Sequence, residues 1–157
     1  FNNPPMGYGR PGALAAALET GRRVVCVTGD GSIMMAIGEL ATIARHCTNV
    51  KVLLLNNLGH SMCRYTQRQW LEGRFAATSA GREGDLAFPC DFAAVARSMG
   101  FGRTVSSSNP HWAGIDKELA EWLRGEHNAF IEVMIDPEAA LAFQVRFGKP
   151  LDECEIA

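Results

Sequence analysis

The chain has 157 residues, of which 47% are hydrophobic and 20% are charged, and its formal net charge is −2. This composition predicts one compact domain with a real core and excludes a disordered or fibrous chain. The charge excludes the basic surface expected of a protein that binds nucleic acid or a membrane, so we expect partners that are small molecules or proteins.

Apolar stretches, cysteine spacing and the first residues of the sequence predict the cellular compartment and whether the chain is part of a longer protein. No apolar stretch reaches the roughly 18 residues of a membrane-spanning helix, and no secretory signal opens the chain. The five cysteines have no CxxC spacing, which predicts a reduced, cytoplasmic protein. The chain opens on Phe1, and "FNNPPMGYGRPG" is typical of the interior of a protein. We therefore expect a fragment of a longer multidomain chain.

The first half of the chain predicts a βαβ unit. The Ala/Leu-rich stretch 11–21, with Pro11 near its start and Gly21 after it, predicts a helix. Continuous apolar runs at 23–29 and 50–57 predict strands buried on both faces. Between them, apolar residues recur at helical spacing from Ser32 to Cys47. Such a crossover places the two strands parallel.

The second half continues the alternation after a region rich in Gly, Ser, Thr and Arg. Residues 58–89 predict a loop region of an active site, with a short helix near 66–73. Asp91 is the expected N-cap of the next helix. The remaining predictions are a helix over 90–100, a short strand over 101–105, a helix over 111–125, a strand over 129–136 and a loose tail after Phe143. The fold class is therefore α/β, an open doubly wound and mainly parallel sheet with helices on both faces.

Polar residues follow the first two predicted strands, at the edge where such sheets bind ligands. Gly29, Asp30, Gly31 and Ser32 follow the first strand, and Asn56-Asn57 follow the second. The glycines allow close approach of the backbone, and the helix that starts near Ser32 favours an anion. Asp30 would repel phosphate unless a cation lay between them. Mg²⁺ takes carboxylate, amide and carbonyl oxygens together with phosphate.

These residues carry a family resemblance. GDG, then 24 residues, then NN resembles the cofactor signature of thiamine diphosphate-dependent enzymes, and "MGYGRPGALAA" and "GELATIAR" are similar to the acetolactate synthase and 2-keto acid decarboxylase group. "TQRQWLEGRFAATS", "DLAFPCDFAAVARSMGF" and "FIEVMIDPE" resemble its acetolactate synthase-like members. The resemblance implies a C-terminal diphosphate-binding domain over 1–143 and a tail over 144–157.

The resemblance also implies roles for individual residues. Asp30, the Asn57 side chain and the Gly59 carbonyl would ligate Mg²⁺. Gly29, Gly31 and Ser32 would contact the diphosphate of thiamine diphosphate, and Met6 would support the folded cofactor. FAD is compatible with the resemblance, but this segment contains no residues that would identify it.

The activity that the resemblance implies is carboligation or decarboxylation of a 2-keto acid. The glutamate that activates the cofactor belongs to a pyrimidine-binding domain of the same or a partner chain, within a homodimer or homotetramer. This segment alone is therefore expected to bind cofactor poorly and to turn over nothing. The alternatives are a simple 2-keto acid decarboxylase built from two short subunits, or a non-catalytic cofactor-binding or dimerising subunit.

Three further residues are weak catalytic candidates. His60 and Cys63 follow the predicted metal-binding turn, although loop residues of these types more often have no catalytic role. Arg64 could receive a substrate carboxylate or simply face water. The tryptophan that family synthases often place after the second asparagine is absent, and this vicinity carries Met62, Arg64 and Tyr65, which leaves the acceptor of the reaction open.

Other interpretations of the motif remain weaker. Asp30 alone could be a helix cap. A dinucleotide-binding fold would need a GxGxxG motif and an acidic residue at the end of the second strand, which the chain lacks. A calcium-binding loop would need oxygen side chains where Ile33, Met34 and Ala36 stand.

Overall fold

The protein is built on a four-stranded parallel sheet with the strand order β1-β2-β4-β3. The computed structural model describes residues 5–78, 90–107, 115–139, 143–145 and 154–156. The strands are β1 (Val24–Gly29), β2 (Val50–Asn56), β3 (Thr104–Ser107) and β4 (Ala129–Met134). The predicted α/β class and mainly parallel sheet are confirmed.

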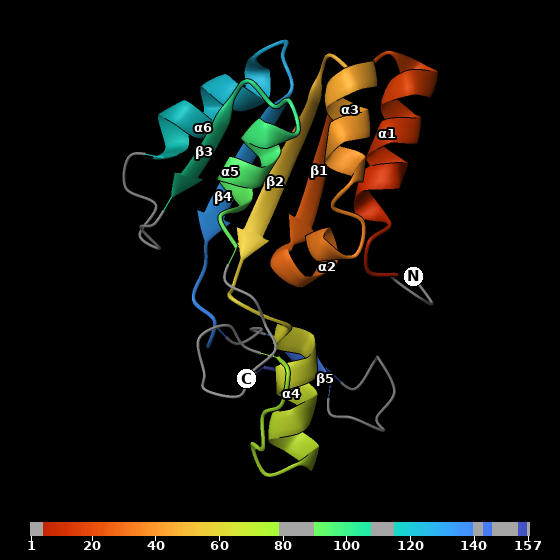
Figure 1. Cartoon of the computed structure of the whole chain (residues 1–157). Helices are drawn as coiled ribbons and strands as arrows, with labels where there is room; N and C mark the ends of the chain where they lie inside the picture. The colour runs from red at the N-terminus through yellow and green to blue at the C-terminus, as the bar shows by residue number, and fades with distance from the viewer. Residues whose placement is uncertain (1–4, 79–89, 108–114, 140–142, 146–153, 157) are drawn as a thin grey trace.

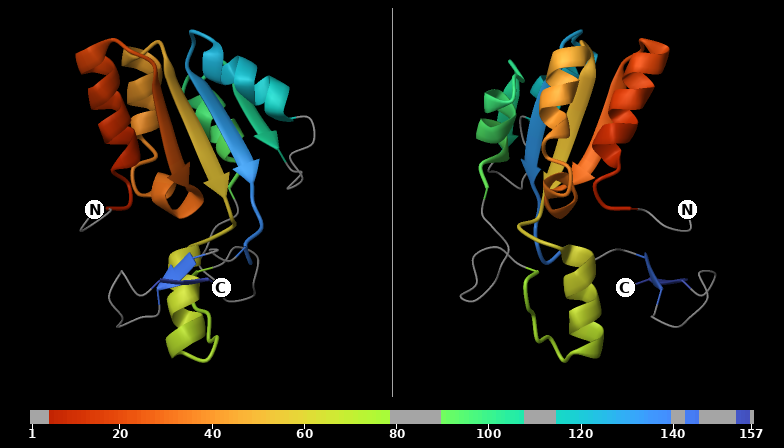
Figure 2. Two further views of the ribbon diagram at one scale, coloured as in Figure 1. Left: turned by 180° about the vertical axis from the view of Figure 1, so that it is seen from behind. Right: turned by 45° about the vertical axis from the view of Figure 1, so that its right-hand side comes forward.

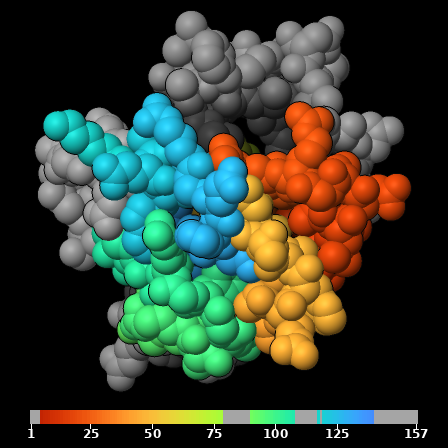
Figure 3. Space-filling view, turned by 90° about the horizontal axis from the view of Figure 1, so that it is seen from above, coloured from red at the N-terminus to blue at the C-terminus, as the bar shows by residue number. Residues whose placement is uncertain are grey.

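Helices cover both faces of the sheet (Figures 1 and 2). They include α1 (Gly9–Thr20), α3 (Glu39–His46), α5 (Phe92–Ser98) and α6 (Ile115–Arg124). Seen from above, these four helices surround the amino ends of the strands (Figure 3). The two predicted end signals are confirmed, because Gly21 ends α1 at a φ of 62° and Asp91 accepts a hydrogen bond of 2.8 Å from the Ala94 amide.

The core lies between the sheet and the layer of α1, α3 and α5. Ile43 of α3, Val52 and Leu54 of β2 and Phe130 of β4 are completely buried there. The Phe101 ring meets the Phe130 ring edge to face, with centroids 6.2 Å apart. Central strand β2 is buried along most of its length, as its apolar run predicts.

The prediction that the first strand is buried on both faces is wrong. Val25 and Val27 of β1 are 49% and 58% exposed, whereas Cys26 between them is buried. The reason is the position of β1 in the sheet. It is an edge strand, and α6 covers the opposite face over the half that holds β4 and β3, away from β1 (Figure 2). An apolar run alone does not distinguish a central strand from an edge strand.

The helix predicted from Ser32 to Cys47 is broken into two. Helix α2 covers Asp30–Met34 and α3 begins at Glu39. Residues 35–38 form turns in which a backbone amide donates to the carbonyl three residues earlier, such as the Glu39 amide to the Ala36 carbonyl. The carbonyls of Ser32 and Ala36, which accept from the Met35 and Glu39 amides, each gain a second donor from the buried side chain of Arg10.

Three other segments differ from the sequence-based prediction. Helix α4 covers Ser61–Trp70, so the predicted loop is helical earlier than expected; residues 79–89 lie outside the described part. Strand β3 begins three residues and ends two residues later than predicted, and residues 111–114 of the expected last helix are not described. After Phe143 the chain is not uniformly loose, because β5 (Phe143–Val145) pairs antiparallel with β6 (Cys154–Ile156).

The carboxyl ends of the strands meet at one edge, beside α2 and α4 (Figure 1). Gly29, the last residue of β1, pairs with Leu55, and Asn56 pairs with Met134 of β4. This register brings the residues after β1 and those after β2 together. Within the described ranges, no helix is both long and apolar enough to cross a membrane.

Candidate functional site

A pocket of about 210 Å³ opens at the carboxyl edge of the sheet. It lies between the end of β1 and the first turn of α4, with the segment before α1 along one side. Its lining consists of Met6, Gly29, Asp30, Gly31, Ser32, Asn57, Gly59, His60, Ser61, Met62 and Cys63. The structure therefore brings together every cofactor-binding residue that the sequence predicts, together with His60 and Cys63.

Three side-chain and backbone groups of the pocket converge. One terminal atom of the Asn57 amide lies 3.0 Å from Asp30 Oδ1 and 2.8 Å from the Gly59 carbonyl oxygen, and the other lies 2.6 Å from Ser61 Oγ. With its nitrogen inward, the amide donates to both oxygens. Turned over, it completes a cluster of three oxygens with no donor among them. The Ser61 hydroxyl suits both orientations, because it can donate or accept.

This oxygen cluster fits a hard divalent cation. Mg²⁺ binds through one or two carboxylates and leaves its other positions to neutral oxygens, water and phosphate. The described residues contain no group of three or more His, Cys, Asp or Glu side chains that could hold a metal. One carboxylate, one amide and one carbonyl are a donor set for Mg²⁺.

The turn after β2 is held in an uncommon conformation. Leu58 has a φ of 59°, which is rare for a residue with a branched side chain, and Gly59 has a φ of 155°. The Leu58 amide donates to Asn56 Oδ1 over 2.9 Å, and Asn56 Nδ2 donates to Glu132 Oε1 over 2.7 Å. Asn56 thus holds the turn in place through hydrogen bonds to Leu58 and Glu132, while Asn57 lines the pocket.

Glu132 is a residue of the site that sequence analysis missed. Its carboxylate is buried in β4 and fixes Asn56. The available signal was an acidic residue inside the apolar run "AFIEVM", since a buried carboxylate requires a partner. Arg10 was missed as well, and one arginine at the start of an Ala-rich helix carries no comparable signal.

Asp30 lies in the first turn of α2 and is 7% exposed. The N-cap position of α2 is Gly29, so the alternative that Asp30 is a helix cap is wrong. Asp30 Oδ2 accepts a 2.6 Å hydrogen bond from the Gly59 amide. Burial raises the pKa of the carboxyl above its ordinary value, and backbone hydrogen bonds from Gly59 and Gly31 oppose part of that shift.

The raised pKa of Asp30 predicts a pH effect on the stability of the metal-free protein. The folded state holds this proton more tightly than the unfolded state, so the free energy of unfolding falls as pH rises from about 3.8 through the folded pKa. Denaturant titrations of wild type and Asp30→Asn, with chelator present, isolate the contribution of Asp30 ionisation to the free energy of unfolding, because asparagine does not titrate. We expect wild type to lose stability relative to the variant as pH rises. If the difference in free energy of unfolding between wild type and Asp30→Asn stayed constant across this pH range, the raised pKa of Asp30 would be contradicted.

The segment before α1 forms a second wall of the pocket. The Gly7 amide donates to Ser32 Oγ over 3.0 Å, and this hydrogen bond ties the segment to α2. Gly7 has a φ of 93°, which favours glycine. Met6, directly before it, is 47% exposed and lines the pocket. An apolar, flexible side chain at this place can support an aromatic ligand.

His60 packs closely over the glycine turn. A Cβ atom placed on Gly31 would lie 2.3 Å from His60 Nδ1, so the imidazole occupies the space that a side chain would fill. The His60 amide donates to the Thr78 carbonyl over 2.8 Å, which anchors the start of α4. Cys63 is an exposed free thiol in the first turn of α4. Both residues reach the pocket.

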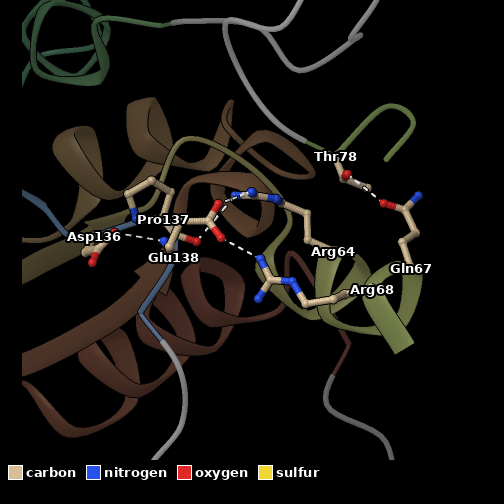
Figure 4. Close-up of polar contacts among 7 residues, drawn as sticks. All are labelled: Arg64, Gln67, Arg68, Thr78, Asp136, Pro137 and Glu138. Carbon is tan, nitrogen blue, oxygen red and sulfur yellow. Dashed lines mark hydrogen bonds and ion pairs between the residues drawn. The ribbon is translucent and has the colours of Figure 1, made fainter. Parts of the chain in front are cut away.

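The hypothesis that Arg64 receives a substrate carboxylate has no support in the structure, because Arg64 is not among the residues that line the pocket and its side chain points toward Glu138 (Figure 4). It is 6% exposed, forms an ion pair with Glu138 and donates to the Pro137 carbonyl over 3.3 Å. Its guanidinium also lies 5.2 Å from the centre of the Phe75 ring. Arg64 anchors α4 to the chain after β4, and Arg68 reaches the same Glu138.

The sequence of the chain is similar to that of known proteins. The family model described as "Thiamine pyrophosphate enzyme, C-terminal TPP binding domain" matches residues 2–133. The chain is 36% identical over 135 residues to the acetolactate synthase isozyme 1 large subunit of Escherichia coli (strain K12), covering 85% of this chain and 22% of that protein. It is 40% identical over 96 residues to the acetolactate synthase large subunit of Parasynechococcus marenigrum (strain WH8102), covering 60% of this chain and 15% of that protein.

A solved structure shares the fold. The thiamine diphosphate-dependent 4-hydroxybenzoylformate decarboxylase of Rhodococcus jostii RHA1 superposes with a TM-score of 0.69 at 23% sequence identity, over 86% of this chain and 24% of that one. At this identity the likeness concerns the fold alone. The chain spans less than a quarter of the length of each of these three proteins.

Proposed function

Because the chain belongs to the family of C-terminal TPP-binding domains of thiamine pyrophosphate enzymes, we propose that its pocket holds the diphosphate of this cofactor through Mg²⁺. The observation that carries the proposal is the convergence of Asp30 Oδ1, the Asn57 amide and the Gly59 carbonyl. A cation held by these three groups offsets the repulsion between the Asp30 carboxylate and a phosphate.

The other pocket residues have roles that follow from their positions. Gly29 and Gly31 allow the diphosphate to approach the backbone, and Ser32 offers a hydroxyl and an amide beside it. Met6 lies on the opposite wall, where its side chain supports the organic part of the cofactor. The cofactor, when bound, supplies the electron sink that lets a bond next to a carbonyl carbon break.

The reaction that we propose is acetolactate synthase-like. In it, one 2-keto acid loses carbon dioxide and the remaining acyl unit joins a second 2-keto acid. The support is the similarity to two acetolactate synthase large subunits. A simple decarboxylase is the second candidate, because the vicinity after Asn57 carries Met62 and Tyr65 without the tryptophan expected of a synthase. In both cases His60 and Cys63, which line the pocket, are candidates among the described residues to move a proton.

The complete enzyme that we propose contains more than this domain. Residues 1–143 form the diphosphate-binding unit, and a pyrimidine-binding domain of the same chain or of a partner subunit in a homodimer or homotetramer supplies the activating glutamate. The supporting observation is length, since the chain corresponds to 22% of a relative to which it is 36% identical. A non-catalytic subunit is the rival, and the intact Asp30, Asn57 and Gly59 cluster argues against it.

Product analysis tests the proposal. We expect the full-length protein, given pyruvate, thiamine diphosphate and Mg²⁺, to release carbon dioxide and form acetolactate, with no turnover when the metal is chelated. The 157-residue chain alone is the control, and we expect it to be inactive. Acetaldehyde as the main product would identify the simple decarboxylase. Cofactor binding without carbon dioxide release from any of a panel of 2-keto acids would favour the non-catalytic subunit.

A further inference from the structure

Arg10 is a fully buried cation beside the pocket. Its side chain is 0% exposed. The guanidinium donates to Thr28 Oγ1 over 3.2 Å, to the Ser32 carbonyl over 2.7 Å, to the Ala36 carbonyl over 3.1 Å and to the Gly7 carbonyl over 3.5 Å. It therefore links α1, β1, the α2–α3 turn and the segment that carries Met6.

All four acceptors of Arg10 are neutral. Within the described residues, no carboxylate forms an ion pair with it. Glu39 interacts with it at longer range, and burial lowers the pKa of the guanidinium; arginine nevertheless stays protonated. Enclosing a charge without a counter-ion costs stability, and neutral hydrogen bonds offset only part of that cost. A purely structural role would not require the charge.

The charge lies behind the wall that the proposed diphosphate would contact. The carbonyl nearest to the guanidinium belongs to Ser32, whose hydroxyl accepts from the Gly7 amide. Ser32 and Met6, the neighbour of Gly7, both line the pocket, whereas Arg10 itself does not. One layer of backbone separates the cation from the cavity, and charges interact strongly across such a layer because little water screens them.

We propose that Arg10 acts as a buried counter-charge for the diphosphate: it strengthens binding of the anionic tail electrostatically, without contacting it. The inference rests on the proposed function and adds a residue that the metal cluster does not include. A bound anion supplies the negative charge that the four neutral acceptors lack. At an effective dielectric constant near 20, a unit charge within about 10 Å changes affinity by about tenfold.

Charge-neutral and charge-retaining variants of the full-length protein test the inference. The probe is Mg²⁺ with thiamine diphosphate, titrated by calorimetry. We expect Arg10→Gln to weaken binding about tenfold, whereas Arg10→Lys stays within about threefold of wild type. Arg22→Gln is the matched control, because Arg22 is exposed at the opposite end of β1, and we expect no change. Equal weakening by Arg10→Gln and Arg10→Lys would show that hydrogen-bond geometry matters instead of charge, and would overturn the proposal.

If Arg10→Gln does not fold, the cofactor affinity of Arg10→Lys measured at several pH values tests the same proposal. Burial lowers the pKa of a lysine, whereas arginine stays charged. We expect the affinity of Arg10→Lys relative to wild type to fall as pH rises from about 6 to about 9. A flat ratio would overturn the proposal. Failure of wild type itself to bind the probe would instead reject the proposed function, so the two failures are distinguishable.

Discussion

Replacement of Asp30 with asparagine is expected to abolish Mg²⁺-dependent binding of thiamine diphosphate. Asparagine keeps the shape of the side chain but removes the only carboxylate of the oxygen cluster, whose other members are the neutral Asn57 amide and Gly59 carbonyl. The metal then has no protein charge to bind, and the diphosphate loses the cation that links it to the protein. Loss of a group that merely orients a metal ligand costs 10- to 100-fold in affinity, so we expect a loss of more than about 100-fold for the ligand itself.

Calorimetric titration of the full-length protein measures this effect, with Mg²⁺ varied at fixed cofactor. Asp91→Asn is the matched control, because Asp91 caps α5 and asparagine caps helices equally well. We expect Asp91→Asn to bind as wild type does. Since removal of a buried charge also relieves its desolvation, Asp30→Asn is expected to fold at least as stably as wild type without metal at neutral pH. Cofactor affinity of Asp30→Asn within tenfold of wild type would reject Asp30 as the metal ligand.

The meeting of Asp30 and Asn57 could be predicted from the sequence because it depends on local signals. Each residue follows a strand, and the helix between the strands makes them parallel neighbours with their carboxyl ends together. The observed register, with Gly29 opposite Leu55, leaves Asp30 and Asn57 no alternative edge. The residues of the proposed metal site could therefore be predicted from strand ends and spacing, without knowledge of packing elsewhere.

The roles of Arg10 and Arg64 could not be predicted in this way, because both depend on partners distant in sequence. Arg64 follows the turn that we propose binds the metal, yet its guanidinium contacts Glu138 and Phe75. Arg10 donates to the Ser32 and Ala36 carbonyls at the break between α2 and α3, in addition to the backbone amides there. Apolar periodicity runs through this break, since Ile33, Leu40 and Ile43 are all buried. Periodicity reports which residues face the core and says little about backbone continuity.

Gly31→Ala is expected to weaken cofactor binding about tenfold, which corresponds to about 1.4 kcal/mol. The added methyl group would lie 2.3 Å from His60 Nδ1 and 2.5 Å from His60 Cε1, so the imidazole must move. The same methyl group would also enter the pocket where we propose that the diphosphate approaches the backbone. Gly38→Ala is the matched control, because a Cβ there meets nothing within 4 Å and its φ is −59°; we expect that variant to bind normally.

The two effects of the Gly31 methyl group separate in a double variant. His60→Ala removes the side chain with which the methyl group collides, so any strain confined to the protein disappears in Gly31→Ala/His60→Ala. If the diphosphate itself needs the space, the double variant stays about tenfold weaker than His60→Ala alone. Recovery of full affinity in the double variant would show that Gly31 serves only to accommodate His60. The comparison therefore tests the close approach of the cofactor to the turn between β1 and α2 independently of the metal.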